Sequence, residues 1–195
     1  HRTLALIKPD SYLHIGKIVN AIEEEGFTLG NIKMVKLTQQ QAEQFYADHK
    51  GKPYFGKLVE HMISDLTVGI ELIGDECVNR WRNIIGPGDP QTAQIESPKS
   101  LRALLGTDMI KNAVHGSDSH SAAARELEFF FSNKSPLKSP AYFHSCSCLI
   151  IKPHILTDGY VGQIIETVLN SGFEISAIQM FWLDRPSAEV KGHRI

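Results

Sequence analysis

The sequence has little cysteine, no long apolar run and no excess of positive charge. Three cysteines, with Cys77 far from Cys146 and Cys148, exclude a disulfide framework and fit a reducing compartment. No apolar run approaches the ~18 residues that a membrane-spanning helix needs. Lysine and arginine number 20 against 22 acidic residues, a net charge of -2, so bulk positive charge does not drive nucleic-acid binding. We expect a cytoplasmic protein without membrane or nucleic-acid partners.

The pair Cys146 and Cys148 has two interpretations. Alternation in a strand would place both side chains on one face. A metal site would need further ligands at workable spacing, and the neighbouring sequence offers none. We therefore interpret the pair as small apolar core residues rather than as metal ligands.

Length and composition predict one complete globular domain and part of another. The chain has 195 residues, of which 42% are apolar and 22% charged. These values are ordinary for a folded protein and exclude collagen, coiled coil and wholesale disorder. Domains usually contain ~100–200 residues. Because the first residue is His1 rather than methionine, we expect a fragment or a processed product.

The sequence repeats itself once. Residues 6–9, Leu-Ile-Lys-Pro, recur as residues 150–153, Ile-Ile-Lys-Pro, at an offset of 144. From Gly16, which matches Gly162, the offset is 146, so the second copy carries two extra residues in one loop. A period of this size indicates tandem domains rather than a solenoid.

The second copy is cut short. We predict a domain at 1–131, an extended and exposed Ser/Pro/Lys linker at 132–142, and a truncated copy at 143–195. The truncated copy should form a strand, a helix and a strand without a complete core. Its exposed apolar edges predict either homo-oligomers or a poorly ordered tail.

The first copy alternates predicted strands and helices. Apolar patterning and cap residues predict strands over 3–7, 27–37 and 66–73, an extended segment over 111–114, and helices over 15–25, 38–48, 53–64, 75–85, 100–105 and 118–131. A long loop covers 86–99. Thr38 and Asp75 are the expected starts of two helices, and either Asp118 or Ser119 is the expected cap of the last helix. This order favours an α+β fold, with helices packed on an antiparallel sheet.

His115 is the strongest candidate for a catalytic residue. It precedes Gly116-Ser117-Asp118-Ser119, a pattern that opens a helix. Because the first amides of a helix lack partners and its dipole favours negative charge, phosphate beside His115 would find donors. Neutral imidazole is also a competent nucleophile near neutral pH. The alternative is that Gly116 makes a turn, the serines only cap the helix, and His115 is an ordinary loop residue.

Three basic residues could oppose a phosphate. Lys8 directly follows the first predicted strand, where side chains often point into a site. Arg82 and Arg102 flank a Gly-Pro-rich loop, and guanidinium offers a planar fork of donors to phosphate oxygens. Taken singly, each arginine fits a solvated surface charge better.

Other side chains near these residues also have two interpretations. Tyr46 could offer a hydroxyl, and Tyr54 could either stack on a base or fill the core. Glu126, eleven residues after His115, could bond one ring nitrogen and set the tautomer, or could be a surface carboxylate.

Taken together, these residues resemble the nucleoside diphosphate kinases. The resemblance covers residues 3–131 and is most specific over 112–119. It also includes Ile7-Lys8-Pro9-Asp10, Tyr46, Arg82, Asp89-Pro90 and Arg102. The tandem layout with a Ser/Pro linker resembles the two-domain members of the family. The resemblance implies a ferredoxin-like fold and a ping-pong reaction, in which the γ-phosphate of a nucleoside triphosphate passes to a histidine and then to a nucleoside diphosphate.

The resemblance also implies a role for each candidate. His115 would be the phosphorylated nucleophile, oriented by Glu126 and supported by Tyr46. Phosphates and sugar would be bound by Lys8, Arg82, Gly88, Arg102 and Asn112, and the base by Tyr54 with Leu58 and Met109 as apolar neighbours. Many members carry threonine where Gly88 stands, and its hydroxyl helps to hold phosphate. Mg²⁺ would be bound through the nucleotide phosphates, so no protein metal ligands are expected.

Two functions from different classes follow. The first is an active nucleoside-diphosphate kinase that acts on ATP and other nucleoside di- and triphosphates. The second is a weakly active or inactive nucleotide-binding scaffold. Tandem members resemble proteins of centrosomes and ciliary microtubules, which implies a γ-tubulin or microtubule-associated partner and a location at the centrosome or ciliary axoneme.

Overall fold

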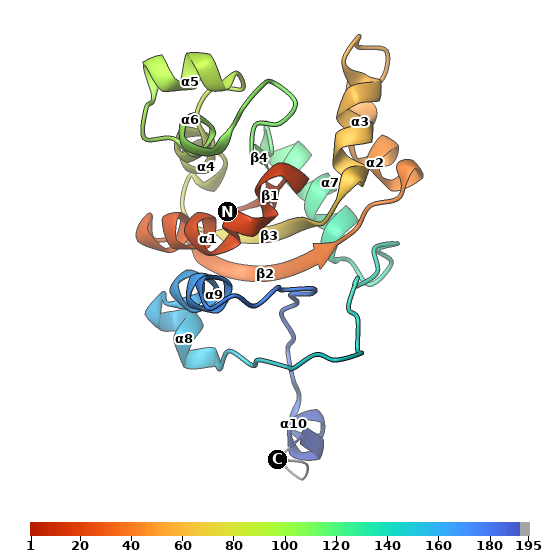
Figure 1. Ribbon diagram of the computed structural model, residues 1–195, viewed down its shortest axis with the longest axis vertical. Helices are drawn as coiled ribbons and strands as arrows, with labels where there is room; N and C mark the ends of the chain where they lie inside the picture. Colours follow the sequence, from red (N-terminus) through yellow and green to blue (C-terminus); the bar gives the residue numbers. More distant parts are fainter. Residues whose placement is uncertain (192–195) are drawn as a thin grey trace.

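A four-stranded antiparallel sheet lies at the centre of the computed structural model, which describes residues 1–191 (Figure 1). The strands are β1 (Arg2–Ile7), β2 (Thr28–Val35), β3 (Thr67–Ile73) and β4 (Val114–Gly116), in the order β2-β3-β1-β4. The central strand β1 pairs with both β3 and β4. This sheet and its helices confirm the predicted ferredoxin-like α+β class.

Helices cover both faces of the sheet because β1 is apolar on both. Ala5 and Ile7 join one apolar cluster with α1 (Ile15–Glu24) and α4 (Cys77–Ile85). Leu4 and Leu6 point the other way, as alternation requires, and join a second cluster. That second cluster includes residues of α2 (Gln39–Phe45), α3 (Phe55–Ser64) and α7 (His120–Phe131). Two short 3₁₀ turns complete the connections: η1 (Pro9–His14) lies between β1 and α1, and η2 (Ala47–His49) lies between α2 and α3.

Most predicted helix starts are correct, and one is wrong. Thr38 forms a capping box with Gln41 at the start of α2, and Ser119 caps α7. Asp75 does not cap α4, because Glu76 takes the N-cap position at a φ of 47° and makes no side-chain cap bond. The predicted long loop 86–99 contains a further helix, α5 (Pro90–Glu96).

Local signals for α5 were present in the sequence. The Asp89 carboxylate accepts hydrogen bonds from the Gln91 and Thr92 amides, and Pro90 occupies the first turn, where a missing N–H costs nothing. A short helix, α6 (Leu101–Leu105), follows and is capped by the hydroxyl of Ser100.

The second copy lies against the first. Its helices are α8 (Pro153–Asp158), α9 (Val161–Asn170) and α10 (Arg185–Lys191). Figure 1 shows α9 directly beside α1, the segment before α10 along the outer edge of β2, and α10 projecting away. The predicted strands of this copy are wrong within residues 143–191, where a single bridge between Lys33 and Gln179 is the only strand-like pairing. The reason is topological: in the first copy β3 separates β1 from β2, and this copy has no counterpart of β3.

The linker is partly packed rather than fully exposed. Leu137 is 5% exposed and joins the second apolar cluster, and its carbonyl accepts a hydrogen bond from Lys33 Nζ at 2.8 Å. Cys146 and Cys148 are exposed and free, so interpreting them as core residues was wrong, whereas Cys77 is buried. The division into separate domains at 131 and 143 stays a prediction.

The expected exposure of apolar side chains on the partial copy is confirmed. Ile150, Phe173 and Trp182 are all more than half exposed. No helix within residues 1–191 is both long and apolar enough to span a bilayer.

Candidate active site

His115 lies in β4, where pairing with Leu6 of β1 fixes its backbone. The next residue, Gly116, belongs to the strand, so the alternative of a turn there was wrong. A Cβ on Gly116 would lie 2.6 Å from Trp81 Cδ1. Trp81 Nε1 in turn donates a hydrogen bond to the His115 carbonyl at 3.3 Å. The glycine therefore lets Trp81 approach and hold the strand that carries the histidine.

A buried carboxylate orients the imidazole of His115. His115 Nε2 lies 3.0 Å from Glu126 Oε2, and the Ser117 hydroxyl donates to the same oxygen at 2.7 Å. In the tautomer in which Nε2–H donates to the Glu126 carboxylate, the free lone pair of the ring is on Nδ1. The His115 side chain is 16% exposed, so solutes can reach it. Sequence reasoning missed Ser117, which it treated only as a helix cap.

Lys8, Asn112 and Gly88 form a chain of hydrogen bonds. Lys8 Nζ donates to Asn112 Oδ1 at 2.6 Å and to the Ile110 carbonyl at 3.0 Å. Asn112 Nδ2 donates to the Gly88 carbonyl at 2.7 Å. Burial lowers the pKa of Lys8 to about 8, so a substantial neutral fraction exists in mildly alkaline solution. Three predicted site residues are thus in contact.

The two arginines have different environments. Arg102 is largely buried and donates to the Gly86 carbonyl at 2.9 Å and to the Val114 carbonyl at 3.0 Å. Burial, followed by the positive charge of Arg82, lowers the pKa of Arg102 to about 10. The Arg102 Nε is buried without a hydrogen-bond partner among the described residues. Arg82 is about half exposed and forms an ion pair with Asp118 of the histidine motif.

Aromatic rings support the histidine from one side. The Tyr46 ring lies edge-to-face with His115 at a centroid distance of 5.8 Å, and Phe45 does so at 5.5 Å. Burial raises the pKa of Tyr46, and its hydroxyl contacts Met62 Sδ at 3.7 Å. Tyr46 therefore supports the imidazole by packing.

Tyr54, Leu58 and Met109, which are expected to contact a base, lie in three different environments. Tyr54 is 41% exposed, and its hydroxyl lies 3.0 Å from His49 Nδ1. Leu58 is buried in the second apolar cluster, whereas Met109 is exposed on a loop. Tyr54 thus reaches the site through His49. The contacts of Tyr54, Leu58 and Met109 with a base stay predictions.

A partly buried acid and a buried histidine hold the loop before His115. Asp10 accepts a hydrogen bond from the Ala113 amide at 2.9 Å through Oδ2, and its Oδ1 lies 2.8 Å from His61 Nε2. Ala113 has a φ of 70°, a left-handed conformation that costs a non-glycine residue ~1–2 kcal/mol. The Asp10 contact offsets part of this cost. The position of Asp10 two residues after Lys8 was a usable signal, but nothing local indicated His61.

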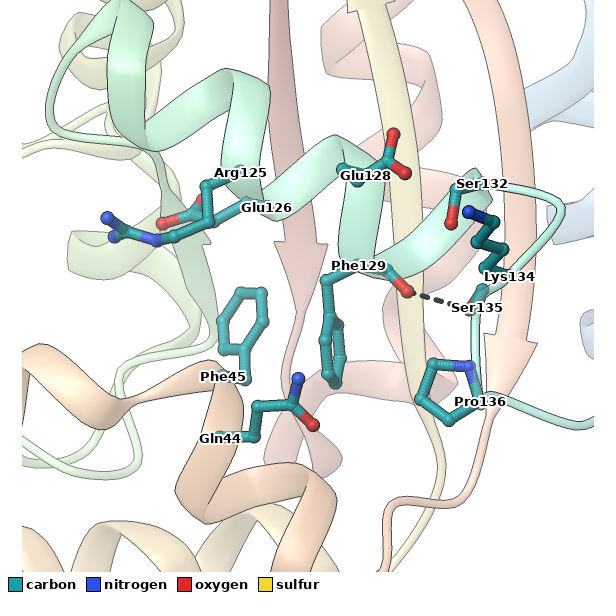
Figure 2. Close-up of a pocket in the computed structure, with 10 residues that line it drawn as sticks. All are labelled: Gln44, Phe45, Arg125, Glu126, Glu128, Phe129, Ser132, Lys134, Ser135 and Pro136. Carbon is teal, nitrogen blue, oxygen red and sulfur yellow. Dashed lines mark hydrogen bonds between the residues drawn. The ribbon is translucent and has the colours of Figure 1, made fainter.

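Two hollows flank Glu126. One, of about 250 Å³, is lined by His115, Tyr46, His49 and Asp118 among others. The other, of about 340 Å³, lies between α2, α7 and the start of the linker. Figure 2 shows the Phe45 and Phe129 rings standing side by side in it, with Pro136 beyond them. Within residues 1–191, no cluster of three or more His, Cys, Asp and Glu residues could hold a metal ion.

The sheet, the strand-borne histidine and the cations around it fit a protein that binds phosphate groups. The family profile described as Nucleoside diphosphate kinase matches residues 1–135. The chain belongs to the nucleoside diphosphate kinase family.

Individual relatives agree with this assignment. The chain is 40% identical over 190 residues to Nucleoside diphosphate kinase homolog 7 of Rattus norvegicus. This alignment covers 96% of this chain and 48% of the relative. It thus spans about half the length of the two homolog 7 relatives, from Rattus norvegicus and Mus musculus, that it matches. It is 42% identical over 132 residues to Nucleoside diphosphate kinase of Actinobacillus pleuropneumoniae strain AP76, covering 67% of this chain and 94% of the relative.

A solved structure shares the fold. The nucleoside diphosphate kinase of Aquifex aeolicus superposes with a TM-score of 0.67 at 41% identity, covering 68% of this chain and 96% of that chain.

Proposed function

We propose that this chain is an active nucleoside-diphosphate kinase that works through a phosphohistidine at His115. The observation that carries the proposal is the contact between His115 Nε2 and Glu126. This contact supports the tautomer with the ring proton on Nε2, in which the Nδ1 lone pair is free to act as the nucleophile. Glu126 also stabilises the positive charge that develops on the ring during attack.

The phosphoryl transfer proceeds in two steps. In the first, the Nδ1 lone pair attacks the γ-phosphorus of a nucleoside triphosphate, and the bond to the β–γ bridging oxygen breaks as the diphosphate leaves. In the second, a terminal oxygen of another nucleoside diphosphate attacks the same phosphorus, and the bond to Nδ1 breaks. The histidine returns to its starting state, so the enzyme alternates between free and phosphorylated forms.

The cations around His115 provide positioning and charge. Phosphoryl transfer depends mainly on in-line placement and on neutralising oxygen charge. An ammonium has three N–H donors, and Asn112 and Ile110 engage two of those of Lys8. The third is then directed to a phosphate oxygen, beside the guanidinium of Arg102. Arg82 would exchange Asp118 for phosphate.

Magnesium fits this site as a companion of the nucleotide. Phosphate oxygens of the nucleotide would supply most of its coordination. Bound there, Mg²⁺ neutralises charge on the polyphosphate.

Steady-state kinetics with ATP and a diphosphate acceptor test the proposal. The wild type should give parallel double-reciprocal lines, which indicate a ping-pong mechanism, and His115→Ala should lose at least ~10³-fold in kcat. His154→Ala, which removes an exposed histidine on α8, is the matched control and should retain full activity. Intersecting lines, or a folded His115→Ala chain with near-normal turnover, would contradict the proposal.

We keep the nucleotide-binding scaffold as the second candidate, because two observations favour weak turnover. Gly88 stands where many family members carry threonine, and Arg82 is engaged by Asp118. A γ-tubulin or microtubule partner, with a centrosomal or ciliary location, belongs to this candidate and rests on the resemblance to tandem members. Co-sedimentation with γ-tubulin complexes that is equal in wild type and His115→Ala would support it. Loss of binding in the variant would oppose it.

A further inference from the structure

The turn that follows β1 holds the loop that leads into β4. Lys8 is the N-cap of η1, and Asp10 lies in its first turn. The Lys8 amide donates a hydrogen bond to the Ala113 carbonyl at 2.9 Å, and the Ala113 amide donates to Asp10 Oδ2 at 2.9 Å. Lys8 Nζ also donates to Asn112 Oδ1 at 2.6 Å. One turn therefore engages both polar groups of the Ala113 backbone and the side chain before it.

Ala113 depends on these contacts for its conformation. Its φ of 70° lies in the left-handed region, which is unfavourable for a residue with a side chain. Ala113 is also fully buried, so without Asp10 its amide would lose its partner away from water, which is costly. His115 lies two residues further along, in β4. A change at Asp10 would therefore relax Ala113 and displace the strand residue that carries the imidazole.

His61 fixes the orientation of the Asp10 carboxylate. Its Nε2 lies 2.8 Å from Asp10 Oδ1, and the two side chains are 6% and 13% exposed. In the tautomer in which Nε2–H donates, His61 engages one carboxylate oxygen and the Ala113 amide engages the other. His61 lies on α3, where Leu58 and Met62 are packed in the second apolar cluster. A packed helix thus supports the carboxylate.

The Asp10 charge also acts on Lys8. Burial lowers the pKa of Lys8 to about 8, and the negative charge of Asp10 opposes this effect. Three other charged or titratable groups face Lys8: Asp108, which favours the ammonium, Arg102, which disfavours it, and His49. Asp10 exerts the largest of the influences that favour the charged form of Lys8.

We propose that Asp10 is a positioning residue for phosphoryl transfer and that His61 holds its carboxylate in place. Through the Ala113 backbone, Asp10 sets the position of His115, and through its charge it favours the ammonium form of Lys8. The inference rests on the proposed function of this site, and it adds the residues that keep the site in its working geometry. Transfer depends on precise placement, so a displacement of ~1 Å is enough to cost ~10²-fold in rate.

The pKa of Lys8 separates a positioning role from a purely structural one. Lysine labelled with ¹³C at the ε carbon is incorporated into the full chain, and its NMR signal is followed with pH. The Lys8 signal is identified by its absence from Lys8→Arg. Asp10→Asn keeps the size of the side chain and removes its charge, so the pKa of Lys8 should fall below about 8. Asp75→Asn, at an exposed position, is the matched control and should leave this pKa unchanged. An unchanged pKa in Asp10→Asn would overturn the proposal.

Kinetics with ATP and CDP connect Asp10 to turnover. In the wild type, kcat/KM should fall above the pKa of Lys8, and in Asp10→Asn this alkaline limb should begin at lower pH. Asp10→Ala also removes the partner of the Ala113 amide, so kcat should fall ~10²-fold at every pH. Asp75→Asn should have the profile of the wild type. A folded Asp10→Ala chain with near-normal kcat would contradict the positioning role.

Two substitutions at His61 test its support of Asp10. His61→Phe keeps a ring in the packed helix but removes the donor to Asp10, so kcat should fall ~5-fold. His61→Gln offers an N–H donor at a similar distance along the side chain and should recover most of this loss. His154→Phe, at an exposed position on α8, is the matched control and should keep full activity. An equal loss in His61→Phe and His61→Gln would show that the hydrogen bond is not what His61 contributes.

The two readouts distinguish failure of this inference from failure of the proposed function. Circular dichroism establishes that each variant is folded, and Asp10→Asn should fold because it keeps an oxygen acceptor for the Ala113 amide. A wild type without kinase activity would refute the proposed function, while the NMR titration would still test the link between Asp10 and Lys8. An active wild type that Asp10→Asn matches in both the pKa of Lys8 and the pH profile would overturn the inference alone.

Discussion

Turnover should fall as pH rises through the pKa of Lys8. Burial lowers this pKa from 10.5 to about 8, while Asn112 and Ile110 hold the ammonium in place. If the charged form binds phosphate, kcat/KM should halve near this pKa and fall ~10-fold one pH unit above it. Bound nucleotide adds negative charge, so the corresponding limb in kcat should lie at higher pH.

Titration of Lys8 should change stability in the opposite direction. The folded pKa of about 8 lies below the unfolded value of 10.5, so the unfolded state holds more protons between these values. The Lys8 contribution to the free energy of unfolding therefore rises with pH across this window, by at most ~3 kcal/mol. A fall in activity there cannot be attributed to unfolding by this group.

The assay uses ATP as donor and CDP as acceptor, because neither adenine nor cytosine titrates in the alkaline range of the profile. Lys8→Arg keeps the charge over this range and should lose the alkaline limb, whereas Lys8→Met should be slow at every pH. A wild-type profile that stays flat to about pH 10, or a Lys8→Arg profile with the same limb, would refute the reasoning.

Three further substitutions test the site. Gly88→Thr places a Cβ where no heavy atom outside the adjacent residues lies within 4 Å and offers a phosphate donor, so kcat/KM should rise ~5-fold. A decrease would show that the Gly88 loop does not face phosphate. Ser117→Ala removes one of the two donors to Glu126. It should lower kcat by ~10-fold and the free energy of unfolding by ~1–3 kcal/mol. An unchanged rate of pre-steady-state phosphorylation would show that Ser117 does not position Glu126. Gly116→Ala drives a Cβ into Trp81 and should cost ~1–3 kcal/mol in urea unfolding, whereas an unchanged midpoint would contradict the packing argument.

Local sequence signals predicted β1, β2, β3 and many helix starts, but they placed the fourth strand at 111–114, whereas β4 is Val114–Gly116 and contains His115. The Thr38 capping box and the Ser119 cap depend on residues within a single turn, so they can be read directly from the chain. The contact of His115 with Glu126 was also anticipated as one of two alternatives, because α7 follows β4 directly. The catalytic and binding roles of these residues remain predictions.

Other features depend on segments far apart in the chain. His61 meets Asp10 across 51 residues, and no periodicity in either segment indicates the contact. The tail shows the same limit. Its apolar segments resemble β1 and β2 in sequence, but a strand needs a neighbour, and β3 has no counterpart there. Helix α9 packs on α1 because the surfaces of the two copies are complementary. The sequence repeat alone does not predict this contact.

Trapping the phosphorylated chain tests the central claim most directly. Wild type and His115→Ala are incubated briefly with γ-labelled ATP and Mg²⁺, and each is then digested or chased with GDP. The account predicts label on the peptide that contains His115, lost in acid, absent from the variant and transferred to GDP. A folded wild type that takes up no label, or label that GDP does not remove, would contradict it.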